Sequence, residues 1–403
     1  MTLFGAREKE SVPWKACASM ELRLQFVMRL KSGERMAELC REFGVSRKTG
    51  YKILGRYEEL GAAGLGDQSR APKSSKVRVP EEIAARVIAA RKAHPGWGGR
   101  KLKAVLERQA PEVRWPAPSK IGTLLKRANL VDPRKRRDSV SRYPNRLVTA
   151  TAPNDLWCTD FKGQFRLGDG KYCYPLTITD RFSRKIIACD GLERIDLDAT
   201  IESFTLAFRE HGLPEMIRSD NGAPFASRGL WGLTRLSVWW WRLGIQHERT
   251  EPASPQQNGQ HERMHRDLKR ETARPSSKNM LAQQERFNEF VDEYNRVRPH
   301  EALGLKTPSE LYKTSSRPMP ARLLHPEYPL HDDIVEVSHG GHIRLGRSQL
   351  FISSALVGQR LGIRECDDGS WVITFVDRDL GTWQPKLGFS ALGAAPLAAP
   401  SAS

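Results

Sequence analysis

The spacing of hydrophobic and polar residues predicts helices in the first part of the chain. Three segments read as helices, namely residues 20–30, 36–43 and 46–60. Between the last two, Gly44 and Val45 can form a tight turn, and Ser46 can cap the helix that follows. This order is typical of a helix-turn-helix, which we assign to a domain of residues 1–65.

A second helical unit is predicted at residues 80–132, after a linker at residues 66–79 that is rich in Ser, Pro and Lys. Its predicted helices cover 81–94, 100–109 and 120–129. Ser119 precedes the last of these helices and is expected to cap it, as Ser46 does in the first unit. Residues 133–150 are predicted to form a basic linker.

From residue 151 the pattern changes to alternating β-prone and helical segments. Strands are predicted over 155–165, 171–180, 183–189, 215–219 and 245–250. Helices are predicted over 197–211, 230–243, 258–272 and 281–297. Three consecutive strands followed by alternating helices and strands indicate an α/β domain with a mixed sheet, which we place at residues 151–316.

The rest of the chain divides into a small β domain and a tail. Short strands separated by turn sequences are predicted between residues 334 and 389, which favours a β-barrel-like domain or sheet over residues 317–390. Residues 391–403 are rich in Ala, Pro and Ser and are expected to be disordered. We therefore expect a multidomain protein with helical units first, an α/β core next and an all-β domain last.

The positive charge of the chain is concentrated in its first part. Residues 1–150 contain 33 Lys and Arg against 15 Asp and Glu, which accounts for the whole net charge of +18. A surface that is merely well solvated would spread this excess along the chain. A basic front part joined to a neutral core indicates that the partner is a polyanion, and we expect double-stranded DNA.

Polar and cationic side chains in one helix of each unit are candidate DNA contacts. In the first unit they are Arg47, Lys48, Thr49 and Lys52, and in the second Lys120, Lys126 and Arg127. A plain helical hairpin is the alternative interpretation of such a unit. The charge distribution favours DNA binding, and two units in tandem suit a protein that grips an extended DNA end.

Several other classes of protein are disfavoured by what the sequence lacks. The six cysteines show no short paired spacing, so neither a zinc knuckle nor a disulfide framework is indicated. A secretory signal and a run of 18 apolar residues are absent, and no Walker loop is present. We expect a cytoplasmic, nucleoid-associated protein without a membrane partner.

Three acidic residues lie where a folded core can bring them together. Asp160 lies inside a predicted strand, where an unpaired carboxylate is costly. Asp220 ends another strand before an Asn-Gly turn, and Glu262 lies in the first turns of a helix. Strand ends and helix starts are rigid and open to substrate, so these residues form the candidate catalytic group.

Carboxylate oxygens are the ligands that Mg²⁺ prefers, and two such ions about 4 Å apart can promote exchange of a phosphodiester bond. No side-chain nucleophile is then needed. Glu262, Arg266 and Lys269 are spaced by four and then three residues, which places them on one helical face that could lie along a DNA end. For Lys269, a solvated surface charge is an equally good interpretation.

Three motifs in this order resemble the integrase-core transposases of bacterial insertion sequences, which are relatives of retroviral integrase. They span residues 157–163, 218–225 and 255–269, with residues 294–300 behind them. The resemblance implies a ribonuclease-H-like core, two Mg²⁺ or Mn²⁺ ions, cleavage at element ends and transfer of the 3′-hydroxyl to target DNA. By motif position it implies Asp160, Asp220 and Glu262 as metal ligands. Because transposition needs two ends held together, we expect a homo-oligomer.

Two features depart from retroviral integrases. Asp220 and Glu262 are separated by 41 residues, more than in those enzymes. Hydrophobic residues recur at helical spacing through the extra length, namely Leu233, Leu236, Trp240 and Leu243. We interpret this length as a longer packed helix that leaves the site intact. The zinc-binding N-terminal module of retroviral integrases is missing from the sequence, and helix-turn-helix units replace it.

Two other functions stay open. The segment from His261 to His265 matches the HExxH signature of zinc proteases. The extended signature fails, because Leu268 occupies its glycine position and no third histidine follows at the required spacing, although Glu285 or Glu289 could be a third ligand. A protease would leave the two aspartates and the basic front part unexplained. The second alternative is a catalytically silent, transposase-derived DNA-binding regulator, against which the presence of all three acidic residues weighs.

Overall fold

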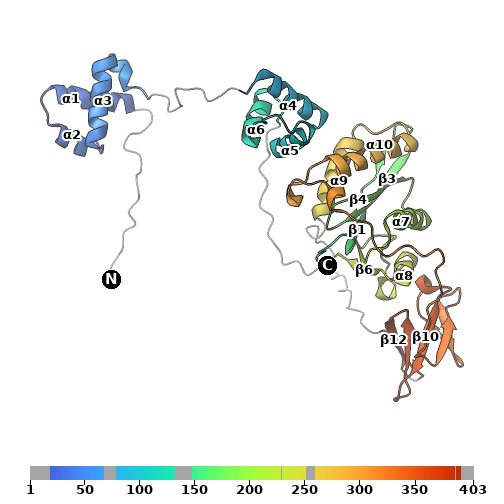
Figure 1. The fold of residues 1–403 in the computed structure, drawn as a ribbon. Helices are drawn as coiled ribbons and strands as arrows, with labels where there is room; N and C mark the ends of the chain where they lie inside the picture. The colour runs from blue at the N-terminus through green and yellow to red at the C-terminus, as the bar shows by residue number, and fades with distance from the viewer. Residues whose placement is uncertain are drawn as a thin grey trace, which may run out of the picture. The chain divides into compact units, whose positions relative to one another are not determined.

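The computed structural model describes residues 19–67, 79–131, 148–227, 229–250, 259–385 and 387–391. The chain forms two compact units, Met1–Arg78 and Val79–Ser403 (Figure 1). Most of the predicted linkers, the tail and the predicted helix start at Asn258 lie outside the described residues. In the described part of the chain, no helix is long and apolar enough to cross a membrane.

The first unit has the predicted helix-turn-helix. Its helices are α1 (Ser19–Lys31), α2 (Met36–Glu42) and α3 (Arg47–Leu60), followed by a 3-10 turn, Gly61–Leu65. The Thr49 N–H donates to Ser46 Oγ over 3.2 Å, so the predicted cap is confirmed. A Cβ at Gly50 would come within 2.8 Å of the Cys40 sulfur. Glycine therefore lets α3 pack closely on α2 and fixes the direction of the exposed face of α3.

The second helical unit contains α4 (Glu81–Ala93), α5 (Gly99–Gln109) and α6 (Pro118–Arg127) around a core that includes Trp97 and Ile121. The predicted cap at Ser119 is wrong, because Ala117 occupies the N-cap position and Pro118 the first helical position. Proline has no N–H to satisfy and its fixed φ suits a helix start, so α6 begins before the serine.

The core contains a mixed sheet in the order β2-β3-β1-β5-β6, with β4 paired to β3. Its strands are β1 (Leu156–Phe161), β2 (Phe165–Arg166), β3 (Tyr172–Asp180), β4 (Ile186–Leu192), β5 (Met216–Ser219) and β6 (Gln246–Arg249). β1 runs antiparallel to β3 and parallel to β5. The predicted mixed sheet and ribonuclease-H-like fold are confirmed, although the predicted strand over 155–165 is two strands, β1 and β2.

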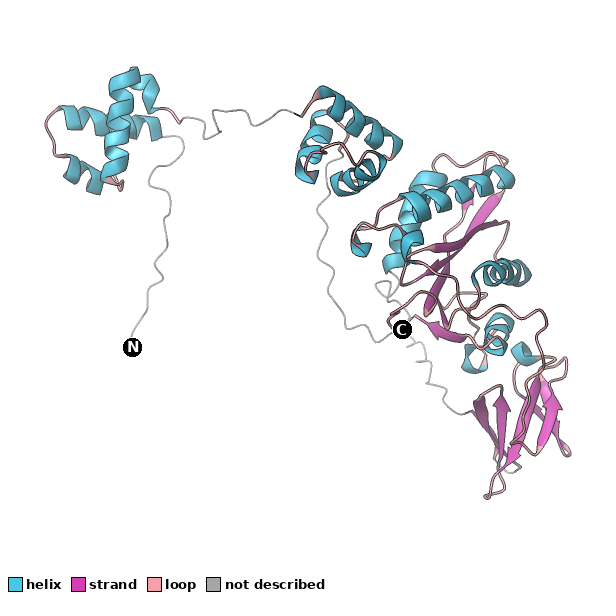
Figure 2. Cartoon of the chain, viewed as in Figure 1, coloured by secondary structure: helices cyan, strands magenta, loops and turns pink. Residues whose placement is uncertain are grey.

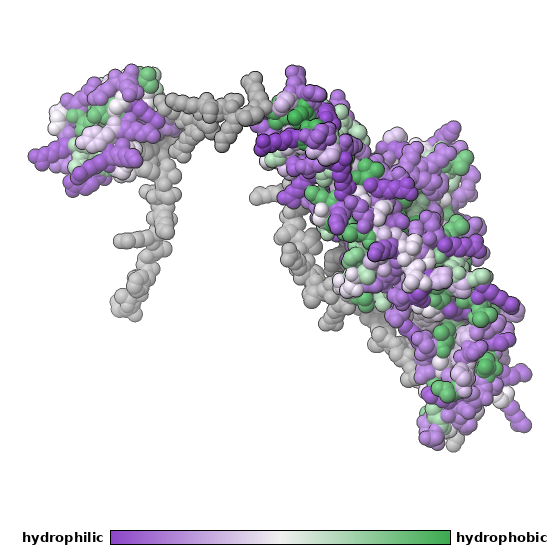
Figure 3. Space-filling model, in the orientation of Figure 1, coloured by the Kyte–Doolittle hydropathy of each residue, from purple (hydrophilic) through white to green (hydrophobic). Residues whose placement is uncertain are grey.

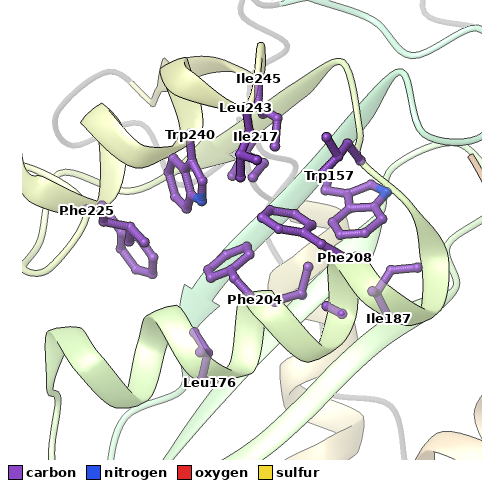
Figure 4. Close-up of a cluster of buried hydrophobic side chains, with 14 residues drawn as sticks. Trp157, Leu176, Ile187, Phe204, Phe208, Ile217, Phe225, Trp240, Leu243 and Ile245 are labelled. Carbon is purple, nitrogen blue, oxygen red and sulfur yellow. The ribbon is translucent and has the colours of Figure 1, made fainter. Parts of the chain in front are cut away.

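Helices cover both faces of this sheet (Figures 1 and 2). They are α7 (Leu197–His211), α8 (Arg235–Arg242), α9 (Gly259–Thr272) and α10 (Met280–Asp292), with a short α11 (Pro308–Leu311). Phe204, Phe208 and Trp240 pack with Trp157 in one hydrophobic cluster (Figure 4). Met264 of α9 and Phe287 of α10 belong to a second cluster. The predicted helix over 281–297 ends earlier, because a π-helical turn, Glu293–Val297, follows α10.

The extra length between the second and third acidic residues is folded differently from the prediction. The predicted helix over 230–243 is wrong: a 3-10 turn, Leu230–Gly232, comes first, and Thr234 then caps the eight-residue α8. Gly232 has a φ of +65°, in the left-handed region, so one α-helix cannot run through it. The four hydrophobic residues expected to pack there are all buried.

The two faces of α8 pack against different partners. Leu236 and Trp240 belong to the cluster of the core, whereas Val238 belongs to the cluster of the C-terminal domain together with Leu233. Trp241 also packs against this second cluster. The extra length therefore joins the C-terminal domain to the core, a role that its hydrophobic spacing alone did not reveal.

The C-terminal domain is all β, as predicted. Its strands are β7 (Asp333–Glu336), β8 (His342–Leu345), β9 (Ser348–Phe351), β10 (Arg360–Glu365), β11 (Trp371–Phe375), β12 (Arg378–Gln384) and β13 (Gly388–Ala391). Five of them form an antiparallel sheet in the order β13-β12-β11-β10-β7, and β8 pairs with β9. Of the two forms that the sequence left open, a barrel-like domain or a sheet, the described residues form a sheet.

The face of the molecule in Figure 3 is mainly hydrophilic.

The packing of α8 gives a test of the fold. Leu236 is fully buried, so Leu236→Ala removes apolar contacts and leaves a cavity. We expect the free energy of unfolding to fall by about 2–5 kcal/mol. Leu206 on α7 is 58% exposed, and Leu206→Ala should change it by less than about 0.5 kcal/mol. Urea denaturation followed by tryptophan fluorescence measures both, and equal effects would contradict the packing described here.

Candidate active site

The strand register places Asp160 and Asp220 side by side. Cys158 of β1 pairs with Arg218 of β5 in a parallel ladder. Asp160 lies two residues beyond Cys158, and Asp220 lies two residues beyond Arg218. Because adjacent strands are about 4.8 Å apart, the two carboxylates come from matching positions at one edge of the sheet.

The third acidic residue reaches the same place from helix α9. Glu262 lies in the first turn of α9 and is exposed. On its inner side, α9 contacts Thr177 of β3, and Thr177 is the direct register partner of Asp160. Helix α9 therefore crosses the sheet at the level of Asp160, and the three predicted residues come together from three separate elements.

The pKa of Asp160 reflects its position beside two other carboxylates. The pKa of its carboxyl is raised to about 7, mainly by burial and then by the negative charges of Asp220 and, to a smaller extent, Glu262, while Lys162 opposes the rise. The Asp160 side chain is 24% exposed, so it stays open to a ligand. The carboxylates of Asp220 and Glu262 are thus close enough to Asp160 to act on its charge, as in a site that holds cations.

Two buried histidines fix α9 against the sheet. Thr177 Oγ1 lies 2.7 Å from His261 Nε2 and 2.6 Å from His265 Nε2. The same hydroxyl donates to the backbone carbonyl of Asp160 over 3.1 Å. Because a hydroxyl has one hydrogen and two lone pairs, it can donate to that carbonyl and accept from both imidazoles. Burial lowers the pKa of His261 to about 3 and lowers that of His265 as well, so both rings are neutral.

The same histidines form the HExxH pattern, and their placement argues against a zinc protease. Asp160, His261 and His265 place one ligand atom each within 4.8 Å of one another, the sole such group of three in the described part of the chain. However, both Nε2 atoms already bond Thr177, and His261 Nδ1 lies 3.0 Å from Thr179 Oγ1. Glu262, which would be the general base, lies on the exposed side of α9. The cluster is explained by packing of the helix on the sheet.

The exposed side of α9 forms a basic groove. A cavity of about 520 Å³ is lined by Lys162, Glu262, Arg266, Lys269, Arg270 and Arg274. The prediction that Glu262, Arg266 and Lys269 share one face is therefore confirmed, while their contact with DNA stays a prediction. Sequence reasoning missed Lys162, Arg270 and Arg274, although Arg270 and Arg274 continue the helical spacing of four from Arg266.

The motif behind the acidic residues holds α9 from its other end. Arg298 forms a buried ion pair with Asp267 of α9, and Asp267 also pairs with Arg270 over 3.0 Å. Asn295 bonds both the backbone N–H and the carbonyl of Ile186 in β4, each over 2.9 Å. The segment from residue 294 to 300 therefore holds α9 against the sheet.

The predicted contacts of the helical units are all accessible. Exposed side chains include those of Arg47, Lys48, Thr49 and Lys52 on α3, and those of Lys120, Lys126 and Arg127 on α6. Tyr51 is 61% exposed on α3, and sequence reasoning missed it. A tyrosine at this position can contact phosphates or bases and extends the candidate surface of the first unit.

Both the core and the basic front part of the chain match known protein families. Residues 150–255 match the integrase core domain, and residues 243–308 match a second description of the same domain. Residues 22–73 match a helix-turn-helix domain, and residues 49–125 match a homeodomain-like domain. The chain is an integrase-core protein related to bacterial insertion-element proteins. The resemblance that the motifs indicated is thereby confirmed.

Several relatives of this integrase-core protein are proteins of bacterial insertion elements. The chain is 28% identical to an uncharacterized protein of insertion element IS476 from Xanthomonas euvesicatoria, over 57% of this chain and 64% of that one, less than two thirds of its length. It is 27% identical to an uncharacterized IS407 protein from Burkholderia multivorans, over 57% of this chain and 80% of that one. A structure of the HTLV-2 integrase catalytic core in complex with magnesium is 18% identical with a TM-score of 0.33, covering 41% of this chain and 100% of that one.

The hydroxyl shared by the two histidines can be tested directly. Thr177→Val leaves buried imidazole N–H groups without an acceptor, so we expect the free energy of unfolding to fall by about 1–3 kcal/mol. Thr205→Val is the control, because among the described residues the Thr205 hydroxyl donates to the Ile201 carbonyl within helix α7 and bonds no other residue. Thermal denaturation compares the two variants, and the account of α9 packing would be wrong if Thr177→Val were no less stable than Thr205→Val.

Proposed function

We propose that this integrase-core protein is a DDE transposase that cleaves DNA at the ends of a mobile element and joins those ends to target DNA. One observation carries the proposal. Asp160, Asp220 and Glu262 meet at one edge of the sheet, and the negative charges of the last two act on a largely buried Asp160.

The donor set fits Mg²⁺ or Mn²⁺. All three groups offer hard carboxylate oxygens, and a divalent cation would offset the repulsion that Asp220 and Glu262 exert on Asp160. Asp160, Asp220 and Glu262 would hold the metal. The chemistry that two such ions supply when bound is activation of an attacking hydroxyl and stabilisation of the leaving oxygen in phosphodiester exchange.

Residues of this chain would bind and orient the DNA. Lys162, Arg266 and Lys269 line the groove next to Glu262, where they can contact phosphates on either side of the reacting bond. The exposed faces of α3 and α6 would recognise the element end in the major groove. Because two ends must be joined to one target, we propose that the active form is a homo-oligomer.

Neutral substitutions of the carboxylates test the catalytic proposal. We expect Asp160→Asn, Asp220→Asn and Glu262→Gln each to reduce cleavage and strand transfer more than about 100-fold, because they remove negatively charged metal ligands. Binding to the same DNA in Ca²⁺ should persist. A gel assay with labelled duplexes from the flanks of the gene measures products in Mg²⁺ or Mn²⁺.

A matched variant keeps this test specific. Asp198 is an exposed acidic residue in the first turn of α7, and Asp198→Asn should retain full activity. If the unmodified protein binds these duplexes but forms no product with either metal, it is a DNA-binding regulator and the catalytic proposal is wrong.

The groove predicts a separate effect on binding. Arg266→Ala and Lys269→Ala should each weaken DNA binding similarly for all sequences and reduce the slope of log affinity against log salt by about 1. Lys278→Ala, an exposed lysine outside the groove lining, is the control and should leave the slope unchanged. Fluorescence anisotropy at several salt concentrations measures the slopes. An unchanged slope for both groove variants would show that the groove does not contact DNA.

A further inference from the structure

A second cavity lies at the seam between the core and the C-terminal domain. It has a volume of about 330 Å³. The side chains that give it its chemistry are Trp231, Trp241, His247, Arg249, Arg378 and Asp379. They come from the turn before α8, from α8 itself, from β6 and from the start of β12. The cavity exists because the C-terminal domain packs against α8, as described above.

The wall on the core side is built around Arg249. Its Nη2 donates to the carbonyl of Trp231 over 3.1 Å. A Cβ at Gly232 would come within 2.0 Å of Arg249 Nη1, so only glycine leaves room for this guanidinium. Trp231 itself has a φ of +52°, a conformation that costs a residue with a side chain of order 1 kcal/mol. The chain thus adopts an unfavourable turn that places an indole beside a cation.

The lining has the chemistry that recognises a nucleotide. Two indoles offer aromatic surface, and the guanidinium of Arg378 lies 5.0 Å from the ring centre of Trp241. Two cations, Arg249 and Arg378, line the cavity together with one carboxylate, Asp379, which accepts a hydrogen bond from Thr374 Oγ1 over 2.7 Å. Burial lowers the pKa of His247 to about 4, so this ring adds no charge. A planar heterocycle next to a phosphate satisfies both the aromatic and the cationic groups.

One buried donor in the lining still lacks an acceptor. The indole N–H of Trp241 is inaccessible to solvent and has no hydrogen-bond partner within the described residues. A buried unpaired donor is costly, but because this N–H is closed to solvent, a ligand in the cavity cannot accept from it directly. The polar contacts of a ligand would therefore come from the side chains of Arg249, Arg378 and Asp379.

The position of the cavity connects it with the candidate active site. Arg249 of β6 pairs with Ser219 of β5, and Asp220 follows directly. Ser219 Oγ donates to the Asp220 carbonyl over 2.9 Å and lies 2.8 Å from His247 Nε2. Strand spacing and the Cα repeat place the Cα atoms of Arg249 and Asp220 within about 9 Å of each other. Side chains alternate along β5, so Arg249, the register partner of Ser219, lies on the opposite face of the sheet from Asp220. A DNA strand at Asp220 would reach the seam around the carboxyl end of β5.

We propose that the seam cavity binds one unpaired nucleotide of the DNA strand next to the cleavage point, with its base against Trp241 and its phosphate between Arg249 and Arg378. The inference rests on the proposed function, because it requires DNA at the three carboxylates. It adds a site that distinguishes a distorted DNA end from a regular duplex, since unpairing is easiest where base pairing is already disturbed.

The test compares two short duplexes that differ by a single unpaired thymidine. The full-length protein is titrated with each in Ca²⁺, and fluorescence anisotropy gives the affinities. We expect the unpaired nucleotide to strengthen binding about tenfold. Arg378→Gln should abolish this preference, and Arg378→Lys should keep part of it. Arg344→Gln is the control, because Arg344 is exposed on β8 of the same domain and does not line the cavity.

A second measurement follows the base itself. Permanganate oxidises an unpaired thymine that is open to solvent, so the thymine should be protected in the complex with the unmodified protein and reactive in the complex with Arg378→Gln. The proposal is overturned if the unmodified protein shows no preference, or if Arg378→Gln keeps both the preference and the protection. Cleavage of paired duplex in Mg²⁺, measured in parallel, separates the two proposals. If the protein cleaves DNA but shows no preference for the unpaired thymidine, only the proposed role of the cavity is refuted. If it shows the preference but does not cleave DNA, the proposed transposase activity is refuted.

Discussion

Asp160 lies on strand β1, which pairs with β5 on one side and with β3 on the other. The geometry of the candidate site depends on these two pairings. On one side, the parallel ladder with β5 sets Asp220 at the matching strand position. On the other side, the antiparallel ladder with β3 sets Thr177 opposite Asp160, and Thr177 holds the histidines of α9. A slip of one residue in either ladder would turn the side chains to the other face and separate the three carboxylates. The site is therefore specified by the sheet, before any metal binds.

Much of this site could be predicted from the sequence, because a carboxylate inside a strand, another at a strand end and a third at a helix start are local features. The common face of Glu262, Arg266 and Lys269 follows from helical spacing and was also predictable. The role of Thr177 was not, because an antiparallel ladder joins it to Asp160 over 17 residues of sequence. The HExxH pattern was ambiguous for the same reason: only the fold shows that its histidines face a threonine.

The fold shows a similar division between local and long-range features. The helix-turn-helix and the cap at Ser46 were predictable from neighbouring residues. The length of α8 was not, because hydrophobic spacing shows that Leu233 and Trp240 are buried but not that they pack in two different clusters, one of the C-terminal domain and one of the core. The arrangement has a functional consequence, since it places the C-terminal domain close to Asp220 and creates the seam that contains Arg249 and Arg378.

The central claim is that Asp160, Asp220 and Glu262 hold the catalytic metal, and the location of Mn²⁺ tests it most directly. Anomalous scattering from crystals of the full chain with Mn²⁺ and an element-end duplex would show where the ions bind. The account predicts peaks bounded by the oxygens of these three carboxylates and none at His261 or His265. A single peak coordinated by Asp160, His261 and His265, the alternative group of ligands in the described residues, would contradict it.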